Sequence, residues 1–167
     1  MILSIMAAMS LNRAIGNKGL LPWGHLPADW AYLHRITKGK KMVMGRKSYD
    51  TPDRVWSEAG NIVITRQADF PLEKGFQRVG NLENAIEILR GEALDEVFII
   101  GGAEIFAQAM PIIDKIYLTL IHATFEGDAF FPLIEPAFFR LIERQDFNAD
   151  ADNKYPYSFL VYERTKR

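Results

Sequence analysis

The chain has 167 residues, enough for one sizeable hydrophobic core, so we expect a single domain over residues 1–167. Its 21 acidic and 20 basic side chains nearly balance, which leaves no excess of positive charge for a nucleic-acid partner. There is no cysteine, and this excludes disulfides, thiolate metal sites and a cysteine nucleophile.

The histidines and the apolar runs narrow the class of protein further. His25, His34 and His122 are far apart and match no metal-ligand spacing, so no metal site is predicted. No apolar run approaches the roughly 20 residues that span a bilayer, so no membrane partner is expected. The apolar start of the chain lacks a basic leader and a cleavage pattern, and it is typical of a buried strand. We therefore expect a cytoplasmic monomer.

Strand-like and helix-like segments alternate over the first two thirds of the chain. Strands are predicted at Leu3–Met9, Met42–Met44, Asn61–Thr65, Gln77–Val79, Val97–Ile100 and Ile116–Ile121, and helices at Pro27–Thr37, Leu82–Leu89 and Ala103–Met110. This alternation predicts crossover units on a largely parallel sheet with helices on both faces.

The last third has a different pattern. Phe139–Phe147 and Tyr157–Glu163 are strand-like, and they are separated by the turn-prone segment Asn148–Asn153. We expect a long C-terminal antiparallel hairpin that closes one edge of the sheet. The acids at its tip do not have the spacing of a calcium loop, so we interpret the tip, which holds Asp150, Asp152 and Asn153, as a solvated loop.

One acid stands out on the first predicted helix. Pro27 suits a first helical turn, and Asp29, Leu33 and Ile36 follow at i, i+4 and i+7, so the acid shares a face with apolar residues. Two interpretations remain open from this spacing. Asp29 either complements the positive end of the helix dipole, or it lies in an apolar pocket and pairs with the amidine-like nitrogens of a heteroaromatic substrate.

Several strand ends carry residues suited to phosphate. Gly101-Gly102 joins a buried strand to a helix, where the backbone can approach a ligand closely. This is not the three-glycine dinucleotide fingerprint, and a plain tight turn is an equal alternative. Arg46-Lys47-Ser48 and Thr65-Arg66 also follow strands, and each such cluster alone is more often a solvated surface charge. Together the three segments outline a site for a phosphate-rich cofactor.

Seven short segments form a combined sequence signature that is more specific than any one of them alone. They are Ile15-Gly16 with Leu21-Pro22-Trp23, Leu26-Pro27-Ala28-Asp29, Met44-Gly45-Arg46-Lys47-Ser48-Tyr49, Ile64-Thr65-Arg66, Ile100-Gly101-Gly102, Tyr117-Leu118-Thr119, and Glu126-Gly127-Asp128 followed by Phe131-Pro132. In this order and spacing the chain resembles the dihydrofolate reductase family over essentially its whole length. The resemblance implies an α/β fold with an eight-stranded, mostly parallel sheet flanked by four helices.

The resemblance also implies an activity: NADPH-dependent reduction of 7,8-dihydrofolate to 5,6,7,8-tetrahydrofolate in one-carbon metabolism. Asp29 would hold the pterin ring, Thr119 would hydrogen-bond to that carboxylate and to the substrate's amino group, and Trp23 would help to order a water. The proton would then arrive through water, since Asp29 is the only evident ionisable group of the pocket. The pocket walls implied are Met6, Ala8, Trp30 and Leu33.

The cofactor site implied by the resemblance follows the strand ends. Ala8 and Ile15 would meet the nicotinamide carboxamide through their backbone, and Arg46, Thr65 and Arg66 would receive the 2′-phosphate. The residues implied around the diphosphate and in the rest of the cofactor site are Gly45, Lys47, Ser48, Gly101, Gly102, Ala103, Glu104, Ile105 and Phe106. Asp128 would tie down the loop over residues 12–23 through the backbone of that loop.

One departure from the family pattern bears on the substrate. The arginine that grips the glutamate tail of the substrate should fall at Ala59, and Arg54 is the nearest cation. A second hypothesis is therefore a reductase of another pterin, or of a riboflavin-pathway pyrimidine, on the same scaffold. Asp29 argues against the pyrimidine. A third hypothesis, a nucleotide-binding module without catalysis, would need Asp29 or Trp23 to be dispensable.

Overall fold

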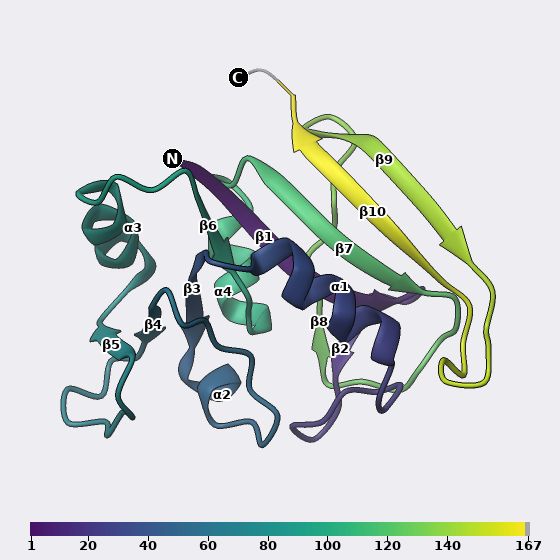
Figure 1. The fold of residues 1–167 in the computed structure, drawn as a ribbon, viewed down its shortest axis with the longest axis horizontal. Helices are drawn as coiled ribbons and strands as arrows, with labels where there is room; N and C mark the ends of the chain where they lie inside the picture. Colours follow the sequence, from purple (N-terminus) through teal and green to yellow (C-terminus); the bar gives the residue numbers. More distant parts are fainter. Residues whose placement is uncertain (166–167) are drawn as a thin grey trace.

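The structure is a computed structural model that describes residues 1–165 (Figure 1). An eight-stranded sheet has the order β5-β4-β3-β6-β1-β7-β10-β9. The strands from β5 to β7 run parallel, whereas β10 pairs antiparallel with both β7 and β9. The bounds are β1 Ile2–Ser10, β3 Lys41–Gly45, β4 Asn61–Ile64, β5 Phe76–Val79, β6 Glu96–Ile99, β7 Lys115–Ile121, β9 Phe139–Phe147 and β10 Tyr157–Arg164. The predicted parallel sheet and C-terminal hairpin are thereby confirmed.

Four helices accompany the sheet: α1 Pro27–Thr37, α2 Arg46–Tyr49, α3 Leu82–Arg90 and α4 Ala103–Ala109. The three longer helices lie where the sequence pattern predicts them, within one residue at each end. Two short strands, β2 Ala14–Gly16 and β8 Ala129–Phe130, pair in a separate small sheet that the pattern did not predict. Among the helices of the described residues, none is both long and apolar enough to cross a membrane.

The side chains of β1 alternate between the two faces of the sheet, and each face has its own hydrophobic cluster. Leu3 and Ile5 face a cluster that includes the apolar sides of α3 and α4, whereas Met6 belongs to the cluster beneath α1. In Figure 1, α1 crosses the front of β1 and β7, and α4 lies behind the sheet. Helices therefore cover both faces, as the hydrophobic pattern of the parallel strands requires.

Packing against β10 fixes α1 on the sheet. The ring of Tyr32 stacks on that of Phe159 with centroids 3.9 Å apart and an interplanar angle of 6°. At the other end of the helix, the hydroxyl of Thr37 donates to the carbonyl of Leu33 at 2.8 Å. Burial of an aromatic pair is a large apolar contribution, so α1 is held mainly by side-chain packing.

The carboxyl ends of the parallel strands meet at one edge of the sheet. The amide of Gly45, at the end of β3, donates to the carbonyl of Gly101 after β6 at 2.7 Å. Ala8 near the end of β1 is in register with Thr119 of β7. This edge is where an open α/β sheet binds ligands, and it collects the residues predicted for both halves of the site.

Candidate active site

Asp29 is a buried carboxyl group on the first turn of α1, with 7% of its surface exposed. Burial raises the pKa of Asp29 above its ordinary value of 3.8, and the side chain of Thr119 on β7 partly opposes the rise. A ligand that donates two hydrogen bonds and carries positive charge would offset the desolvation of the ionised form. Buried groups with perturbed pKa values often mark functional sites.

Two other buried polar atoms lack partners in the described chain: the indole Nε1 of Trp23 and the hydroxyl Oγ1 of Thr119. The Thr119 hydroxyl lies close enough to the Asp29 carboxylate to lower its pKa, although it makes no hydrogen bond of ordinary geometry. Because buried polar atoms nearly always have a partner, these two donors indicate a place for a bound ligand and a water.

Apolar residues surround this polar group on the α1 face of the sheet. Three of the four implied pocket walls, Met6, Ala8 and Leu33, belong to one cluster, which also contains Trp23. Trp30 is not a member of that cluster. Its half-buried ring lies between the rings of His25 and His34, with centroids 6.3 and 6.0 Å away.

Glycines shape the backbone where β3 and β6 end. Gly101 has φ +120°, and its peptide bond to Gly102 is cis. A Cβ on Gly101 would lie 3.4 Å from the Ser48 hydroxyl, and one on Gly45 would lie 3.1 Å from Ile105. No side chain caps the start of α4, so its first amides are free to face a phosphate. The surface fits a diphosphate that lies directly against the main chain.

Exposed cations flank this turn. Arg46 and Lys47 begin α2, and Arg66 follows β4. Arg46 has one weak polar contact, 3.4 Å to the amide oxygen of Gln67, and within residues 1–165 neither arginine forms an ion pair. Thr65 is buried, and its hydroxyl accepts from the Gln67 amide at 3.2 Å. The two arginines remain available to a phosphate monoester.

A family model for dihydrofolate reductase matches residues 2–164. The chain belongs to the dihydrofolate reductase family. Over 163 residues it is 37% identical to the dihydrofolate reductase of Bacillus subtilis (strain 168), covering 98% of this chain and 95% of the relative. Over 164 residues it is 34% identical to that of Staphylococcus haemolyticus, covering 98% and 96%.

A solved structure gives the same result for the fold. The dihydrofolate reductase from Enterococcus faecalis, complexed with NADP(H) and RAB-propyl, superposes with a TM-score of 0.87 at 29% identity. The match covers 99% of this chain and 97% of that one. The family's eight-stranded fold, expected from the seven segments, is thereby confirmed.

Arg54 is already engaged by neighbours within this reductase fold. Its guanidinium lies 2.5 Å from the Glu73 carboxylate and donates to the carbonyl of Tyr49 at 3.2 Å. It also packs over the rings of Tyr49 and Phe76, 4.2 and 5.0 Å from their centroids. Ala59, where the family resemblance leads us to expect an arginine, is exposed. Arg54 is therefore ion-paired in this structure, and its predicted role in holding the substrate tail stays a prediction.

Asp128 contacts the loop before α1, as the resemblance implies. Its carboxylate accepts from the amide of Lys18 at 2.9 Å, and its own amide donates to the carbonyl of Gly16 at 2.9 Å. The preceding Gly127 allows this approach, because a Cβ there would lie 2.9 Å from the Cβ of Ala14. The segment before β8 thus holds the loop over residues 12–23 through main-chain contacts.

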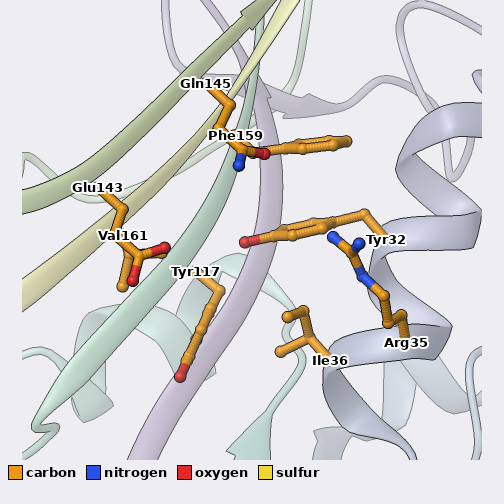
Figure 2. A pocket seen from close by; sticks show the side chains of 8 residues that line it. All are labelled: Tyr32, Arg35, Ile36, Tyr117, Glu143, Gln145, Phe159 and Val161. Atoms are coloured by element: carbon orange, nitrogen blue, oxygen red, sulfur yellow. The ribbon is translucent and has the colours of Figure 1, made fainter.

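A separate cavity of about 280 Å³ lies between α1 and strands β7, β9 and β10 (Figure 2). Figure 2 shows Arg35 and Glu143 on opposite sides of the Tyr32 hydroxyl. Burial, followed by the nearby carboxylates of Glu96 and Glu143, raises the pKa of Tyr117 to about 12. None of the residues predicted for the active site lines this cavity, so it is distinct from the site around Asp29.

Two contributors to the site region escaped the sequence analysis. Tyr32 packs α1 onto β10, and its position three residues after Asp29 could have signalled a shared helix face. Asn153 is 6% exposed, and its side chain accepts from the amide of Ala28 at 2.9 Å. The interpretation of the whole hairpin tip as a solvated loop is therefore wrong for Asn153, although Asp150 and Asp152 are exposed.

Proposed function

We propose that this chain reduces 7,8-dihydrofolate to 5,6,7,8-tetrahydrofolate with NADPH as the hydride donor. The observation that carries the proposal is the buried Asp29 carboxyl group beside the unpartnered hydroxyl of Thr119. Membership of the dihydrofolate reductase family supports it over the full fold. A carboxylate and a hydroxyl on an otherwise apolar surface complement the amino-pyrimidinone edge of a pterin.

Asp29 binds and orients the substrate in this proposal. Its two oxygens accept from the ring N–H and the exocyclic amino group of the pterin, and the Thr119 hydroxyl bridges to that amino group. Met6, Ala8, Trp30 and Leu33 pack against the ring. The negative charge of Asp29 polarises the ring and favours protonation at the nitrogen next to the carbon that accepts the hydride.

Protonation of that nitrogen requires water, because Asp29 holds the opposite edge of the ring. Trp23 donates its indole N–H to a water beside the pterin and fixes the position of that water. The loop over residues 12–23, anchored by Asp128, excludes bulk solvent while the transfer takes place. Asp29, Trp23 and Thr119 are therefore the residues we propose as catalytic.

The residues at the strand ends fit NADPH, which supplies the hydride when it is bound. Gly101, Gly102 and the start of α4, with Gly45, Lys47 and Ser48, would hold the diphosphate against the main chain. Arg46, Thr65 and Arg66 would hold the 2′-phosphate, and the backbone of Ala8 and Ile15 would meet the carboxamide. The remaining members of the proposed cofactor site are Ala103, Glu104, Ile105 and Phe106.

A steady-state assay of the purified protein with dihydrofolate and NADPH tests the proposal. We expect oxidation of NADPH that depends on dihydrofolate and yields tetrahydrofolate, and loss of that activity in Asp29→Asn. Absence of turnover in folded protein that binds NADPH would refute the activity. Dihydrobiopterin, which has no glutamate tail, belongs in the same assay.

A second candidate is a reductase for a pterin without a glutamate tail. It is favoured by Ala59, which stands where the family arginine is expected, and by the ion pair that Arg54, the nearest cation in sequence, makes with Glu73. The ratio of kcat/KM for dihydrofolate and dihydrobiopterin separates the two candidates. A clear preference for dihydrofolate supports the first, and a preference for dihydrobiopterin supports the second.

We further propose that residues 1–167 act as one domain, as a monomer in the cytoplasm. The single family match over residues 2–164 and the one eight-stranded sheet support this organisation. Light scattering on purified protein tests the monomer: a mass near 19.1 kDa is expected, and twice that mass would contradict it.

A further inference from the structure

The first turn of α1 lacks a cap of its own. Leu26 occupies the N-cap position and offers no side-chain acceptor, and Pro27 has no N–H. The amides of Asp29 and Trp30 both donate to the carbonyl of Leu26, at 3.0 and 3.4 Å. Ala28 is left as the first-turn amide with no acceptor in the helix or in the loop before it.

The missing acceptor comes from the far end of the chain. The side-chain oxygen of Asn153, in the loop between β9 and β10, accepts from the Ala28 amide at 2.9 Å. Figure 1 shows this loop reaching down beside the beginning of α1. Ala28 immediately precedes Asp29, so the contact lies one residue from the carboxylate that we place in the pterin site.

Asn153 is itself held in place on several sides. Its backbone amide and its side-chain amide both donate to Asp150, at 2.7 and 3.0 Å, while the Asp150 amide donates to the Asn153 carbonyl at 2.9 Å. The amide of Asp152 also donates to Asp150 at 2.9 Å. An amide side chain is needed here, because it must accept from Ala28 and donate to Asp150 at once.

We propose that Asn153 is a positioning residue for the reaction: it caps α1 from the β9–β10 hairpin and so fixes where Asp29 meets the substrate. The inference rests on the proposed function of Asp29. Because the cap comes from the hairpin, the loop over residues 12–23 can open and close while the first turn of α1 stays ordered. An N-cap supplied by that loop would be lost whenever the loop moved.

The test compares two equivalent truncations on different helices. Asn153→Ala removes the cap of α1, and Asn81→Ala removes the N-cap of α3, where the Asn81 side chain accepts from Asn84 at 2.8 Å. Both variants should lose stability to urea. Only Asn153→Ala should lower kcat/KM for dihydrofolate, by roughly five- to tenfold, which corresponds to the ordinary free energy of one cap. The Kd for NADPH should not change in either variant.

A swap of the two polar residues provides the rescue. Asn153→Asp alone sets two carboxylates against each other and should be impaired, whereas Asp150→Asn with Asn153→Asp restores a donor and an acceptor and should recover most of kcat/KM. This pair also replaces the first test if Asn153→Ala does not fold. Asp152→Ala, at an exposed tip residue, should behave like the native protein. Equal kcat/KM for Asn153→Ala and Asn81→Ala, or an equal loss in Asp152→Ala, would overturn the proposal.

Hydrogen exchange gives a readout that does not depend on turnover. Exchange at the Ala28 amide should be faster in Asn153→Ala and unchanged in Asn81→Ala, and unchanged exchange in both would overturn the proposal. Affinity for a 2,4-diaminopyrimidine, whose amidine edge pairs with a carboxylate, should fall in Asn153→Ala alone. If the native protein does not reduce dihydrofolate, the proposed function fails, while these two measurements still decide whether Asn153 positions α1.

Discussion

The substrate half and the cofactor half of the candidate site consist of different kinds of groups. The substrate half consists of side chains on long elements, with Asp29 on α1 and Thr119 on β7 both buried. The cofactor half consists mainly of backbone at strand ends, where Gly45 and Gly101 approach each other closely, and of exposed arginines. The substrate half therefore depends on how a helix is placed, and the cofactor half depends on the shape of the main chain and on exposed positive charge.

This difference predicts how each half responds to change. A substitution in the substrate half removes a buried group whose pKa and hydrogen bonds are set by packing, so its effect should be large and insensitive to salt. A substitution among the exposed cations removes an interaction that salt already weakens.

Asp29→Asn should have the largest effect. It preserves shape but removes the charge, and hydride transfer at neutral pH should fall by roughly 10²- to 10⁴-fold, the range typical of groups that govern protonation. Single-turnover measurements of NADPH oxidation check this. Near-native activity in the variant would show that Asp29 does not have the proposed role.

The same variant should be more stable than the native protein at neutral pH. The pKa of Asp29 is raised in the folded state, so folding favours its protonated form. That contribution is fully present below the unfolded value of 3.8 and is lost as pH rises through the folded value. Urea unfolding should therefore show a gain for Asp29→Asn that grows as the pH rises from 3.8 to the folded pKa and then stays constant, and a gain independent of pH over that range would contradict it.

The cofactor half should show a smaller effect that depends on salt. Two charge-assisted contacts from Arg46 and Arg66, at roughly 1.5 to 3 kcal/mol each before losses to solvent, should favour NADPH over NADH by a few kcal/mol. Arg66→Ala should erode that preference, and added salt should do the same. Arg78→Ala, an exposed arginine on the neighbouring β5, is the control and should not. Comparable kcat/KM for the two cofactors in the native protein would contradict the assignment.

The contact between Asp128 and the loop over residues 12–23 should have a smaller effect on the reaction than the residues above. Asp128→Ala removes the acceptor for the Lys18 amide and should slow hydride transfer or change product release by roughly tenfold, with little change in stability or in NADPH affinity. Asp128→Asn retains an oxygen acceptor and should be milder. Glu126→Ala, a neighbouring exposed acid, serves as the control. Identical pre-steady-state rates in all three variants would remove the anchor role.

The smallest effects are expected at the residues predicted to lie near the glutamate tail of the substrate. Ala59→Arg should lower the KM for dihydrofolate roughly three- to tenfold with little change in kcat, because an exposed charge pair contributes modestly and uniformly. Glu73→Gln should lower KM less, by releasing Arg54 from its ion pair. Neither variant should alter KM for dihydrobiopterin. Strong discrimination in favour of the glutamate tail by the native protein would show that another cation holds it.

The sequence pattern was sufficient to predict those helices and strands in which apolar residues recur at a regular spacing. Pro27–Thr37 was predicted with its observed bounds, because proline opens the helix and the apolar residues recur at helical spacing. The sequence also placed the glycine turn and the basic clusters at strand ends, and the observed contact between Gly45 and Gly101 agrees with the rule that parallel strand ends share an edge. The pairing of β2 with β8 was not predictable, because segments of three and two residues carry no period.

Contacts between residues far apart in the sequence were the second kind of feature that the sequence pattern could not predict. The solvated-loop interpretation of the hairpin tip failed at Asn153, since its partner lies 125 residues away and no local pattern marks the pair. Arg54 stays the predicted cation for the substrate tail, but its present partner was not foreseen. Its ion pair with Glu73 depends on how the segment before β5 packs, which sequence periodicity does not report.

The cap on α1 also sets an order of events for a chain that is made from its N-terminus. Residues 27–37 leave the ribosome long before residue 153, so the nascent chain contains the helix but not the acceptor for its first turn. The separation of 125 residues makes this one of the late, non-local contacts that slow folding. A chain that stopped short of Asn153 would hold every side chain proposed for the pterin pocket, but it would lack both the cap of α1 and the strand β10 against which α1 packs.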